Sequence, residues 1–411
     1  MKMEIPNLRH LGAICEVARQ GSISAAARHV HLSQPAITQA ISGIEARLGL
    51  ALFRRSAAGM APTEAGRIFA ARIERMQAQL RAGAQAASAL SAPSGGRGFG
   101  AFDRLMSAAQ MRALIALSRA RNFSMAARRV GVSQPSLHRA ARDLERLAGF
   151  DLFRAEGSSV TLTPPARALA RHARLALAEI GQGLSEIAAL KGRDSTRIAI
   201  GSMPLARASV LPGAMAAMLE AHPNVQLQTI EGPYDTLLDG LRHGEIDLLI
   251  GALRDPLPAE DVQQEVLFQD DLALIVAAAH PLAQRRDTGL SDTLAYPWIA
   301  PPRDTPSGRY LSALLDIPSL ARTPVRVVSS SLVLLRAMLL EGDFITIVSR
   351  QQMQRDLAEG RFVRLPIPLP GSGRPIGLTT RADWRPTATQ ARFLDILRER
   401  CRKGGDYMKT E

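Results

Sequence analysis

The chain has 411 residues, is 46% hydrophobic and carries a formal net charge of +13, so it is long enough for two to four domains with buried cores. Its two cysteines, Cys15 and Cys401, exclude a disulfide-rich secreted class and a CxxC metal pair, and Cys15 is predicted to be a small core residue. The sequence shows no signal-peptide pattern and no apolar run that would span a bilayer, so we expect a cytoplasmic protein.

The positive charge is concentrated in the first half of the chain. Residues 1–193 contain 27 Lys/Arg and 12 Asp/Glu, a balance of +15, whereas residues 194–411 contain 24 and 26, a balance of −2. A generally basic proteome would charge both halves. The asymmetry therefore indicates a part that binds a polyanion, joined to a neutral part with a different task.

One stretch of the basic half occurs twice, 100 residues apart. Positions 24–63 and 124–163 are identical at fifteen of forty positions without a gap. The period is too long for a solenoid, so the repeat predicts a duplicated domain.

Each copy is expected to form three helices. The first covers residues 8–18, Ser24 is expected to cap the second, and Ser33 to cap the third, with Pro35 in its first turn. The third helix has an apolar face with spacings of three and four. Its polar residues then point outward, which is the geometry of a helix-turn-helix. The apolar residues are Ile37, Ile41, Ile44 and Leu48, repeated as Leu137, Ala141, Leu144 and Ala148.

Two short extended pieces around Gly59 predict a hairpin, the wing of a winged helix. Arg54 and Arg55 at its edge are either phosphate contacts or merely solvated. Thr63 is expected to cap a long helix with one apolar stripe, and such a stripe outside a domain core requires a partner helix. In the second copy Pro164-Pro165 predict a later helix start, and the longer stripe there makes that helix the better candidate for joining two chains.

From Arg197 short apolar strands alternate with helices, which predicts two α/β lobes with a ligand cleft between the strand ends. The predicted fold is therefore multidomain, with two mainly α-helical winged helix-turn-helix domains and a two-lobed α/β domain. The expected boundaries are 1–63 for the first winged helix-turn-helix domain, 64–90 for the first linker helix, 91–103 for a flexible linker, 104–163 for the second domain, 164–193 for the second linker helix, 194–404 for the α/β domain (lobe I 194–275 and 377–404, lobe II 276–376) and 405–411 for a tail.

These residues resemble the LysR-type transcriptional regulators. The likeness spans some sixty residues of the DNA-binding domain, through Ala26-Ala27-Arg28, Leu32-Ser33-Gln34-Pro35-Ala36, Ile44-Glu45, Leu48-Gly49, Leu52-Phe53-Arg54 and Thr63-Glu64-Ala65-Gly66. The region from 197 is similar to the family's effector-binding domain, which is similar in turn to type 2 periplasmic binding proteins, at His222-Pro223, Gly244-Glu245-Ile246-Asp247-Leu248 and His280-Pro281-Leu282. A weaker likeness to the galactose-binding-protein-regulator subgroup rests on Gly232-Pro233-Tyr234, Gly251-Ala252-Leu253-Arg254 and Ser329-Ser330-Ser331. The duplication departs from the family, whose usual member has one DNA-binding domain.

The resemblance implies that the third helix of each copy enters the major groove of double-stranded DNA. Gln pairs with adenine and Arg with guanine, so the two copies are hypothesised to read different half-sites. The alternative is that one copy is a scaffold. The DNA-binding candidates are Ser33, Gln34, Pro35, Thr38, Gln39 and Arg54 in the first copy, and Ser133, Gln134, Pro135, Ser136, His138, Arg139, Arg142 and Arg154 in the second.

The resemblance also implies that a small-molecule effector, an organic acid or a sugar derivative, binds between the lobes. Arg207 and Arg303 are candidates for additional charge there. The effector candidates are Ser202, Met203, Tyr234, Ala252, Thr305, Ser307 and Ser330.

The sequence thus predicts a DNA-binding transcriptional regulator, a homo-oligomer (dimer or tetramer) joined through its linker helices, with no metal, cofactor or membrane. An enzyme is disfavoured because Walker A, HExxH and GxSxG motifs are absent from the sequence. Two non-enzymatic functions stay open beside regulation by an effector. The first is an architectural DNA-binding protein that needs no effector. The second is an interaction module that no longer binds DNA.

Overall fold

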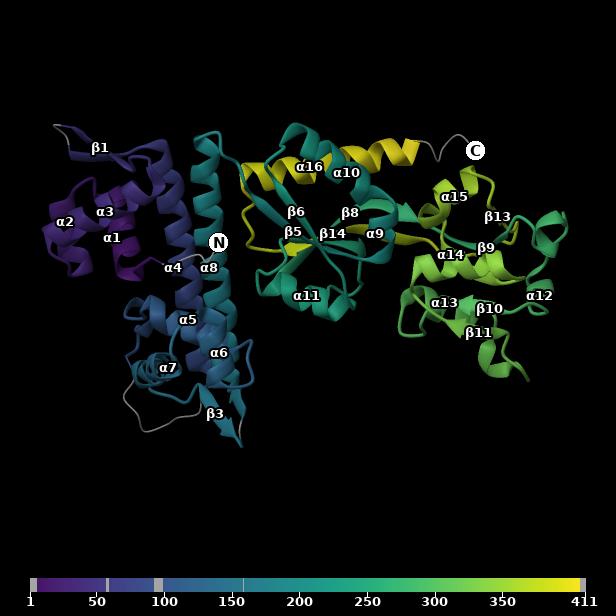
Figure 1. Ribbon diagram of the computed structural model, residues 1–411, viewed down its shortest axis with the longest axis horizontal. Helices are drawn as coiled ribbons and strands as arrows, with labels where there is room; N and C mark the ends of the chain where they lie inside the picture. The colour runs from purple at the N-terminus through teal and green to yellow at the C-terminus, as the bar shows by residue number, and fades with distance from the viewer. Residues whose placement is uncertain (1–5, 57–58, 92–98, 158, 407–411) are drawn as a thin grey trace. The chain divides into compact units, whose positions relative to one another are not determined.

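The computed structural model describes residues 6–56, 59–91, 99–157 and 159–406 (Figure 1). The chain divides into two compact units, Met1–Thr196 and Arg197–Glu411. Residues 92–98 of the expected linker and 407–411 of the expected tail lie outside the described part.

The first winged helix-turn-helix domain folds because capping residues separate its helices. Asn7, Ser22 and Ser33 each accept a backbone N–H at a helix start. The expectation that Ser24 is the cap is wrong: Ser22 has the extended backbone that a cap needs, and Ser24 lies inside the helix. The elements are α1 (Leu8–Gln20), α2 (Ile23–Val30), α3 (Gln34–Leu48) and the antiparallel wing strands β1 (Phe53–Ser56) and β2 (Gly59–Pro62).

The second domain repeats this arrangement with the same registers. Its wing hairpin pairs Phe153 with Leu162, as the first wing pairs Phe53 with Pro62. Each wing is also held to the turn before the second helix of its copy, by Met60 N–H to Gly21 in one and Val160 N–H to Arg121 in the other, both at 2.7 Å. The elements are η1 (Phe102–Arg104), α5 (Ala108–Leu117), α6 (Phe123–Val130), α7 (Gln134–Ala148), β3 (Phe153–Glu156) and β4 (Ser159–Leu162).

The two linker helices, α4 (Glu64–Leu90) and α8 (Pro164–Leu190), start at equivalent positions. Thr63 and Thr163 cap them in the same way, through their hydroxyl oxygens. The predicted later start of the second linker helix is therefore wrong. Pro164 and Pro165 occupy the first helical turn, where the missing N–H has no intrahelical partner to lose.

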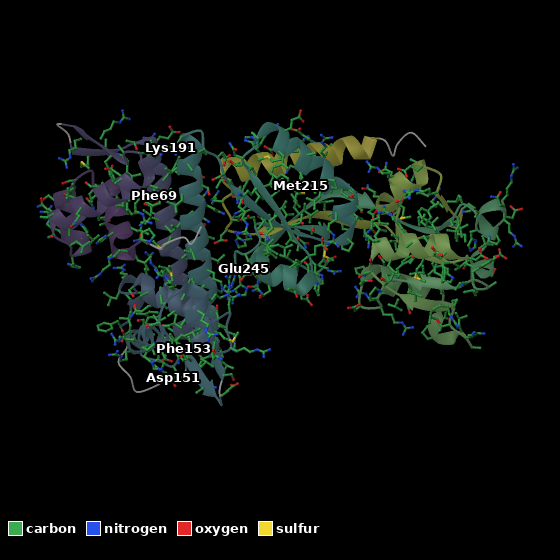
Figure 2. All side chains as sticks on the ribbon, viewed as in Figure 1. Phe69, Asp151, Phe153, Lys191, Met215 and Glu245 are labelled. Atoms are coloured by element: carbon green, nitrogen blue, oxygen red, sulfur yellow. The ribbon has the colours of Figure 1, made fainter. Side chains whose placement is uncertain are left out.

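The apolar faces of α4 and α8 pack against each other within one chain (Figure 1). The prediction that these stripes join two chains is therefore corrected for the described residues. The helices are antiparallel, because Arg72 near the start of α4 contacts Glu186 near the end of α8. Figure 2 shows Phe69 and Lys191 toward one end of the pair and Phe153 toward the other.

The second unit contains two five-stranded sheets, in the orders β6-β5-β7-β14-β8 and β11-β10-β12-β9-β13. Parallel pairs join β5 to β6 and β7, and β10 to β11 and β12, while β9 and β14 run antiparallel to their neighbours. The strands are β5 (Arg197–Ser202), β6 (Gln226–Ile230), β7 (Leu248–Ala252), β8 (Val262–Asp270), β9 (Leu272–Ala277), β10 (Trp298–Ala300), β11 (Val325–Val328), β12 (Ile345–Ser349), β13 (Phe362–Arg364) and β14 (Arg374–Arg381).

Helices cover these sheets with separate cores in the two lobes. The first sheet packs on α10 and α16 through buried Ile198, Ile200, Met218 and Phe393. Trp298 is fully buried in the second lobe. The helical elements are α9 (Pro204–Ala208), α10 (Val210–Ala221), α11 (Tyr234–Arg242), η2 (Pro281–Gln284), α12 (Leu290–Thr293), α13 (Pro306–Leu314), η3 (Ile317–Ser319), α14 (Leu332–Glu341), η4 (Arg350–Met353), α15 (Gln354–Ala358) and α16 (Ala388–Asp406).

The chain crosses between the lobes earlier than the predicted boundaries. β8 ends at Asp270 in the first sheet and β9 begins at Leu272 in the second, so the crossing lies at Asp271 and not at 275/276. The return strand β14 belongs to the first sheet from Arg374, three residues before the predicted return at 377. The differences arise because Leu272–Ala277 pairs with β12 and β13 along its whole length.

Candidate DNA-binding and effector sites

The two recognition helices, α3 and α7, are built alike. The hydroxyl oxygen of Ser33 accepts the Ala36 N–H and that of Ser133 accepts the Ser136 N–H, both at 3.3 Å. One face of each helix is buried in the core of its domain, with Ile37 fully buried in α3 and Leu144 fully buried in α7. The helices therefore hold their remaining polar positions on the outside.

The predicted DNA contacts lie on that outer surface. Thr38 is half-buried, and its hydroxyl donates to the Gln34 carbonyl at 3.0 Å. Arg54 and Arg154 are exposed at the start of the wings, on β1 and β3. The other exposed candidates are Ser33, Gln34, Pro35 and Gln39 on the first copy, and Ser133, Gln134, Pro135, Ser136, His138, Arg139 and Arg142 on the second.

Besides the capping serines and Thr38, three of the longer side chains have partners inside their own domain. The Gln34 amide donates to Ser24 on α2 at 3.2 Å. In the second copy the His138 ring lies 4.8 Å from the Phe123 ring, and Arg142 donates to Glu145 at 2.6 Å. The two exposed faces thus differ in residues and in internal contacts. To reach a base, His138 would leave or share its contact with Phe123, and Arg142 its contact with Glu145.

Sequence reasoning gave no role to Glu45 and Glu145, which position the wings. The Oε1 atom of Glu45 accepts the N–H groups of Leu52 and Phe53 at 2.6 and 3.2 Å. That of Glu145 accepts those of Leu152 and Phe153, both at 2.9 Å. Each carboxylate thereby connects a recognition helix to the first wing strand. The available signal in the sequence was that both copies have a glutamate at this position.

In the first lobe, four predicted effector residues gather at the carboxyl ends of parallel strands. Ser202 ends β5, Met203 follows it, Ala252 ends β7 and Tyr234 begins α11 after β6. Met203 fills the space above Gly251, where an added Cβ would lie 2.3 Å from the Met203 Cγ. Ligands of open parallel sheets bind at this edge.

The polar atoms of this edge are incompletely paired. The Ser202 Oγ and the Tyr234 hydroxyl are buried, and neither has a hydrogen-bond partner among the described residues. Burial raises the pKa of Tyr234, and the Arg254 guanidinium lies 4.5 Å from the centre of its ring. Arg207 donates to the Ser202 carbonyl at 2.6 Å and lies 3.4 Å from Glu231. The edge therefore combines unpaired hydroxyls with two cations.

The second lobe holds the other three candidates near the ends of β10 and β11. Thr305 caps α13, accepting the Gly308 N–H and donating to the Pro302 carbonyl, so its hydroxyl is already used. Ser307 accepts from Arg374 at 2.8 Å. Ser330 is exposed between β11 and α14, as is Arg303 before α13. The structure thus gathers the effector candidates into two groups, one in each lobe.

A buried network that sequence reasoning missed connects the crossing strands. Asp270, fully buried at the end of β8, accepts from Ser349 at 2.6 Å and from Arg374 at 3.0 Å. Burial raises the pKa of Asp270, although both partners oppose the shift. Arg374 also contacts Ser307, so one guanidinium connects the lobe crossing to a predicted effector residue. The three residues lie 67 to 104 positions from their partners, and no local sequence signal marks them.

A metal site and a bilayer-spanning helix are both missing from the described part of the chain. It contains no group of three His, Cys, Asp or Glu side chains able to hold a metal ion. In the same residues no helix has the length and continuous hydrophobicity that a bilayer span requires.

Comparison with known proteins assigns both units. The family described as "Bacterial regulatory helix-turn-helix protein, lysR family" matches residues 8–67 and again residues 108–167. The family described as "LysR substrate binding domain" matches residues 191–402. Both DNA-binding copies are therefore recognised, followed by one effector domain.

Similar proteins match this chain over most of their own length. The HTH-type transcriptional regulator GalR of Pseudomonas putida is 31% identical over 397 residues, which is 97% of this chain and 98% of that protein. The HTH-type transcriptional regulator PcaQ of Agrobacterium fabrum is 26% identical over 289 residues, covering 70% of this chain and 93% of that protein. A solved full-length OxyR of Pseudomonas aeruginosa has the same fold, with a TM-score of 0.51 and 22% identity over 72% of this chain and 94% of its own.

The relatives at the sequence level are named as regulators and not as enzymes. The chain belongs to the LysR family of DNA-binding transcriptional regulators, with a duplicated helix-turn-helix domain and one effector-binding domain.

Proposed function

We propose that both helix-turn-helix copies read operator DNA, and that a small organic acid or sugar-derived ligand bound between the lobes controls this binding. The observation that carries the DNA part is the exposure of the same polar helix face in both copies. Gln34 and Gln134, at equivalent positions, both point to the surface from the first turn of a capped helix. Exposed Arg54 and Arg154 add phosphate-binding charge beside them.

The alternative is an architectural DNA-binding protein that needs no effector and in which one copy is a scaffold. The internal contacts of His138 and Arg142 favour the second copy for that role. The two proposals predict different effects of single substitutions.

Binding of the full chain to the DNA upstream of its own gene tests them. Gln34→Ala and Gln134→Ala are each expected to weaken binding by about tenfold or more, because a bidentate Gln–adenine pair contributes about 1–3 kcal/mol of discrimination. Gln85→Ala is a matched control, since Gln85 is an exposed glutamine on α4 and belongs to neither recognition helix. If one glutamine change leaves affinity and footprint intact, that copy is not a reader.

The effector part rests on the strand-end edge of the first lobe. Buried hydroxyls without partners are costly, and a ligand oxygen that pairs with Ser202 and Tyr234 would remove that cost. Arg254 over the Tyr234 ring favours an anionic ligand over a neutral one, whereas Arg207 shares its charge with Glu231. We therefore rank organic acids before neutral sugars.

A thermal-shift screen with mono- and dicarboxylates and with neutral sugars tests this part. A stabilising ligand is expected to raise the melting temperature of the wild type and to lose most of that effect with Ser202→Ala. The same ligand should change affinity for the upstream DNA, because differential binding to two states couples the sites. A stabiliser without any effect on DNA binding would favour the architectural alternative.

We further propose that any homo-oligomer, dimer or tetramer, forms through surfaces other than the apolar stripes of α4 and α8. Those stripes are buried against each other in one chain. Light scattering of the purified protein, with and without DNA, measures the number of chains.

A further inference from the structure

The α4–α8 pair has an approximate two-fold relationship inside one chain. A Cβ placed on Gly83 would lie 2.6 Å from the His172 Cβ, and one placed on Gly183 would lie 3.1 Å from the Arg72 Cβ. The repeat offset of 100 makes Gly83 equivalent to Gly183 and Arg72 equivalent to His172. Reciprocal contacts of this kind are those of a two-fold symmetric interface between identical subunits. Here both sides of the interface belong to the same polypeptide.

The polar contacts follow the same two-fold relationship but differ in charge. Arg72 contacts Glu179 at 2.9 Å, and the equivalent His172 contacts Gln79, which is equivalent to Glu179, at 2.8 Å. Arg72 also pairs with Gln182 and Glu186 at 2.7 and 2.8 Å, where the other end of the interface has Ala82 and Ala86. At one end an arginine therefore contacts two carboxylates, and at the other end a histidine contacts an amide.

This difference favours pairing of α4 with α8 over pairing of either helix with itself. In the same register, two copies of α4 would place Arg72 opposite Gln79, Ala82 and Ala86, none of which is a carboxylate. Two copies of α8 would place Glu179 and Glu186 opposite His172 and Leu175, without an arginine. The α4 pair would bury an arginine without a carboxylate, and the α8 pair would offer its two buried carboxylates a histidine in place of an arginine, so both like pairs are less favourable than the mixed pair. The charge pattern thus selects the mixed pair.

The same pair joins two unlike recognition surfaces. The first copy exposes Gln34 and Gln39, and the second exposes Gln134 and Arg139 at the equivalent positions. Lys191, at the end of α8, donates to the Leu48 carbonyl at the end of α3 at 3.0 Å, so the second linker helix also contacts the first recognition helix. The first reader thereby contacts the linker helix of the second copy, and the second domain packs on the same helix through α5.

We propose that a single chain is a complete two-reader unit, and that it recognises a non-palindromic DNA site whose two halves differ. The α4–α8 pair does within the chain what a two-fold helix pair does between two single-reader chains. A short tether gives the mixed pair a high effective concentration, and the charge pattern excludes the like pairs. This inference rests on the proposed reading of DNA by both copies.

Selection from a random-sequence duplex library with the purified full chain provides the first test. The expected motif has two unlike halves at a fixed separation, and the mass of the complex is expected to correspond to one chain for each motif. A palindromic motif that needs two chains would overturn the inference while leaving the proposed function standing. Failure to enrich any duplex would instead contradict the proposed function.

Complementation between defective chains provides the second test. One variant carries Gln34→Ala and Gln39→Ala, and the other carries Gln134→Ala and Arg139→Ala. Each is expected to bind the selected motif at least about tenfold more weakly, and an equal mixture should bind no better than the stronger variant. Recovery of wild-type affinity in the mixture would show that readers of different chains cooperate, and would overturn the inference. Gln85→Ala, an exposed change on α4, is the control and should bind as the wild type does.

Discussion

Arg72 and Glu179 lie 107 positions apart in the sequence and form an ion pair of 2.9 Å between Nη1 and Oε2, with both side chains more than nine-tenths buried. Burial opposes the charged form of Arg72, but its hydrogen bonds to Glu186 and Glu179 outweigh that effect and raise its pKa. The pair connects the two linker helices, and with them the two DNA-binding domains.

Arg72→Ala is expected to lower the free energy of unfolding of the N-terminal unit by about 3 kcal/mol, because it leaves buried carboxylates without this partner. His172→Ala, the equivalent change at the other end, should cost about 1 kcal/mol, since it removes the hydrogen bond with Gln79 and leaves no buried carboxylate without its arginine. Urea denaturation followed by circular dichroism compares the two variants. Equal losses would show that the ionic end has no special role.

The two glycines of the helix interface provide a second matched pair. Gly83→Ala places a Cβ 2.6 Å from the His172 Cβ, a clash that forces the helices apart, and is expected to destabilise the unit by about 1–3 kcal/mol. Gly183→Ala meets Arg72 at 3.1 Å, and the higher helix propensity of alanine offsets much of that cost, so its effect should be small. The midpoints of thermal unfolding measure both. A larger loss for Gly183→Ala would contradict the described packing.

Replacing the carboxylates that hold the wings should destabilise both copies, and in the second copy it also removes the ion pair between Glu145 and Arg142. Glu45→Ala and Glu145→Ala each leave two backbone N–H groups without an acceptor and are expected to cost about 2 kcal/mol. The Gln variants keep one acceptor oxygen and should cost less. Unfolding by urea measures the stability, and DNA affinity reports the position of the wing. If the Ala and Gln variants behave alike, the hydrogen bonds contribute little.

The two cysteines should be unreactive in the folded protein. Burial raises the pKa of Cys15 from 9.0 to about 12 and that of Cys401 from 9.0 to about 11, so both stay protonated at pH 8. Because both values are raised in the folded state, their contribution to stability is complete below pH 9 and decreases as the pH rises through the interval up to about 12. Labelling with a thiol reagent at pH 8 should be slow, and should become fast in denaturant. Rapid labelling of the native chain would contradict the burial of these thiols.

Ser202→Ala separates a structural role from a ligand-binding role. The Ser202 Oγ is buried and has no hydrogen-bond partner among the described residues, so its removal should leave the stability of the ligand-free protein unchanged or slightly increased. Thr305→Ala, in contrast, removes the cap of α13 and should cost about 1 kcal/mol. Thermal unfolding without ligand distinguishes them. A marked loss of stability in Ser202→Ala would mean that the hydroxyl has a structural partner.

Much of the fold follows from local pattern. Hydroxyl caps, apolar spacing and the exact repeat were enough to predict the helix-turn-helix units, although the cap at Ser22 and the start of α8 at Pro164 were missed by one to a few residues. Strand β9 was predicted at its observed bounds because Leu272–Ala277 is a continuous apolar run that is buried at every position. Strand β8 was not predicted, because it lies at the edge of its sheet and Gln263, Gln264 and Glu265 interrupt its apolar residues.

The sequence by itself determined that there are two helix-turn-helix domains and one two-lobed α/β domain, because capping, periodicity and duplication are local properties of the chain. Only the tertiary structure decided that α4 pairs with α8 of the same chain, that Glu45 and Glu145 hold the wings, and that Arg374 connects Asp270 to Ser307. Most of these relationships join residues that are distant in sequence. The pairing of α4 also depends on whether its partner helix comes from the same chain or from another chain. An apolar stripe shows that a helix needs a partner, but the identity of that partner depends on charges brought opposite one another by the fold.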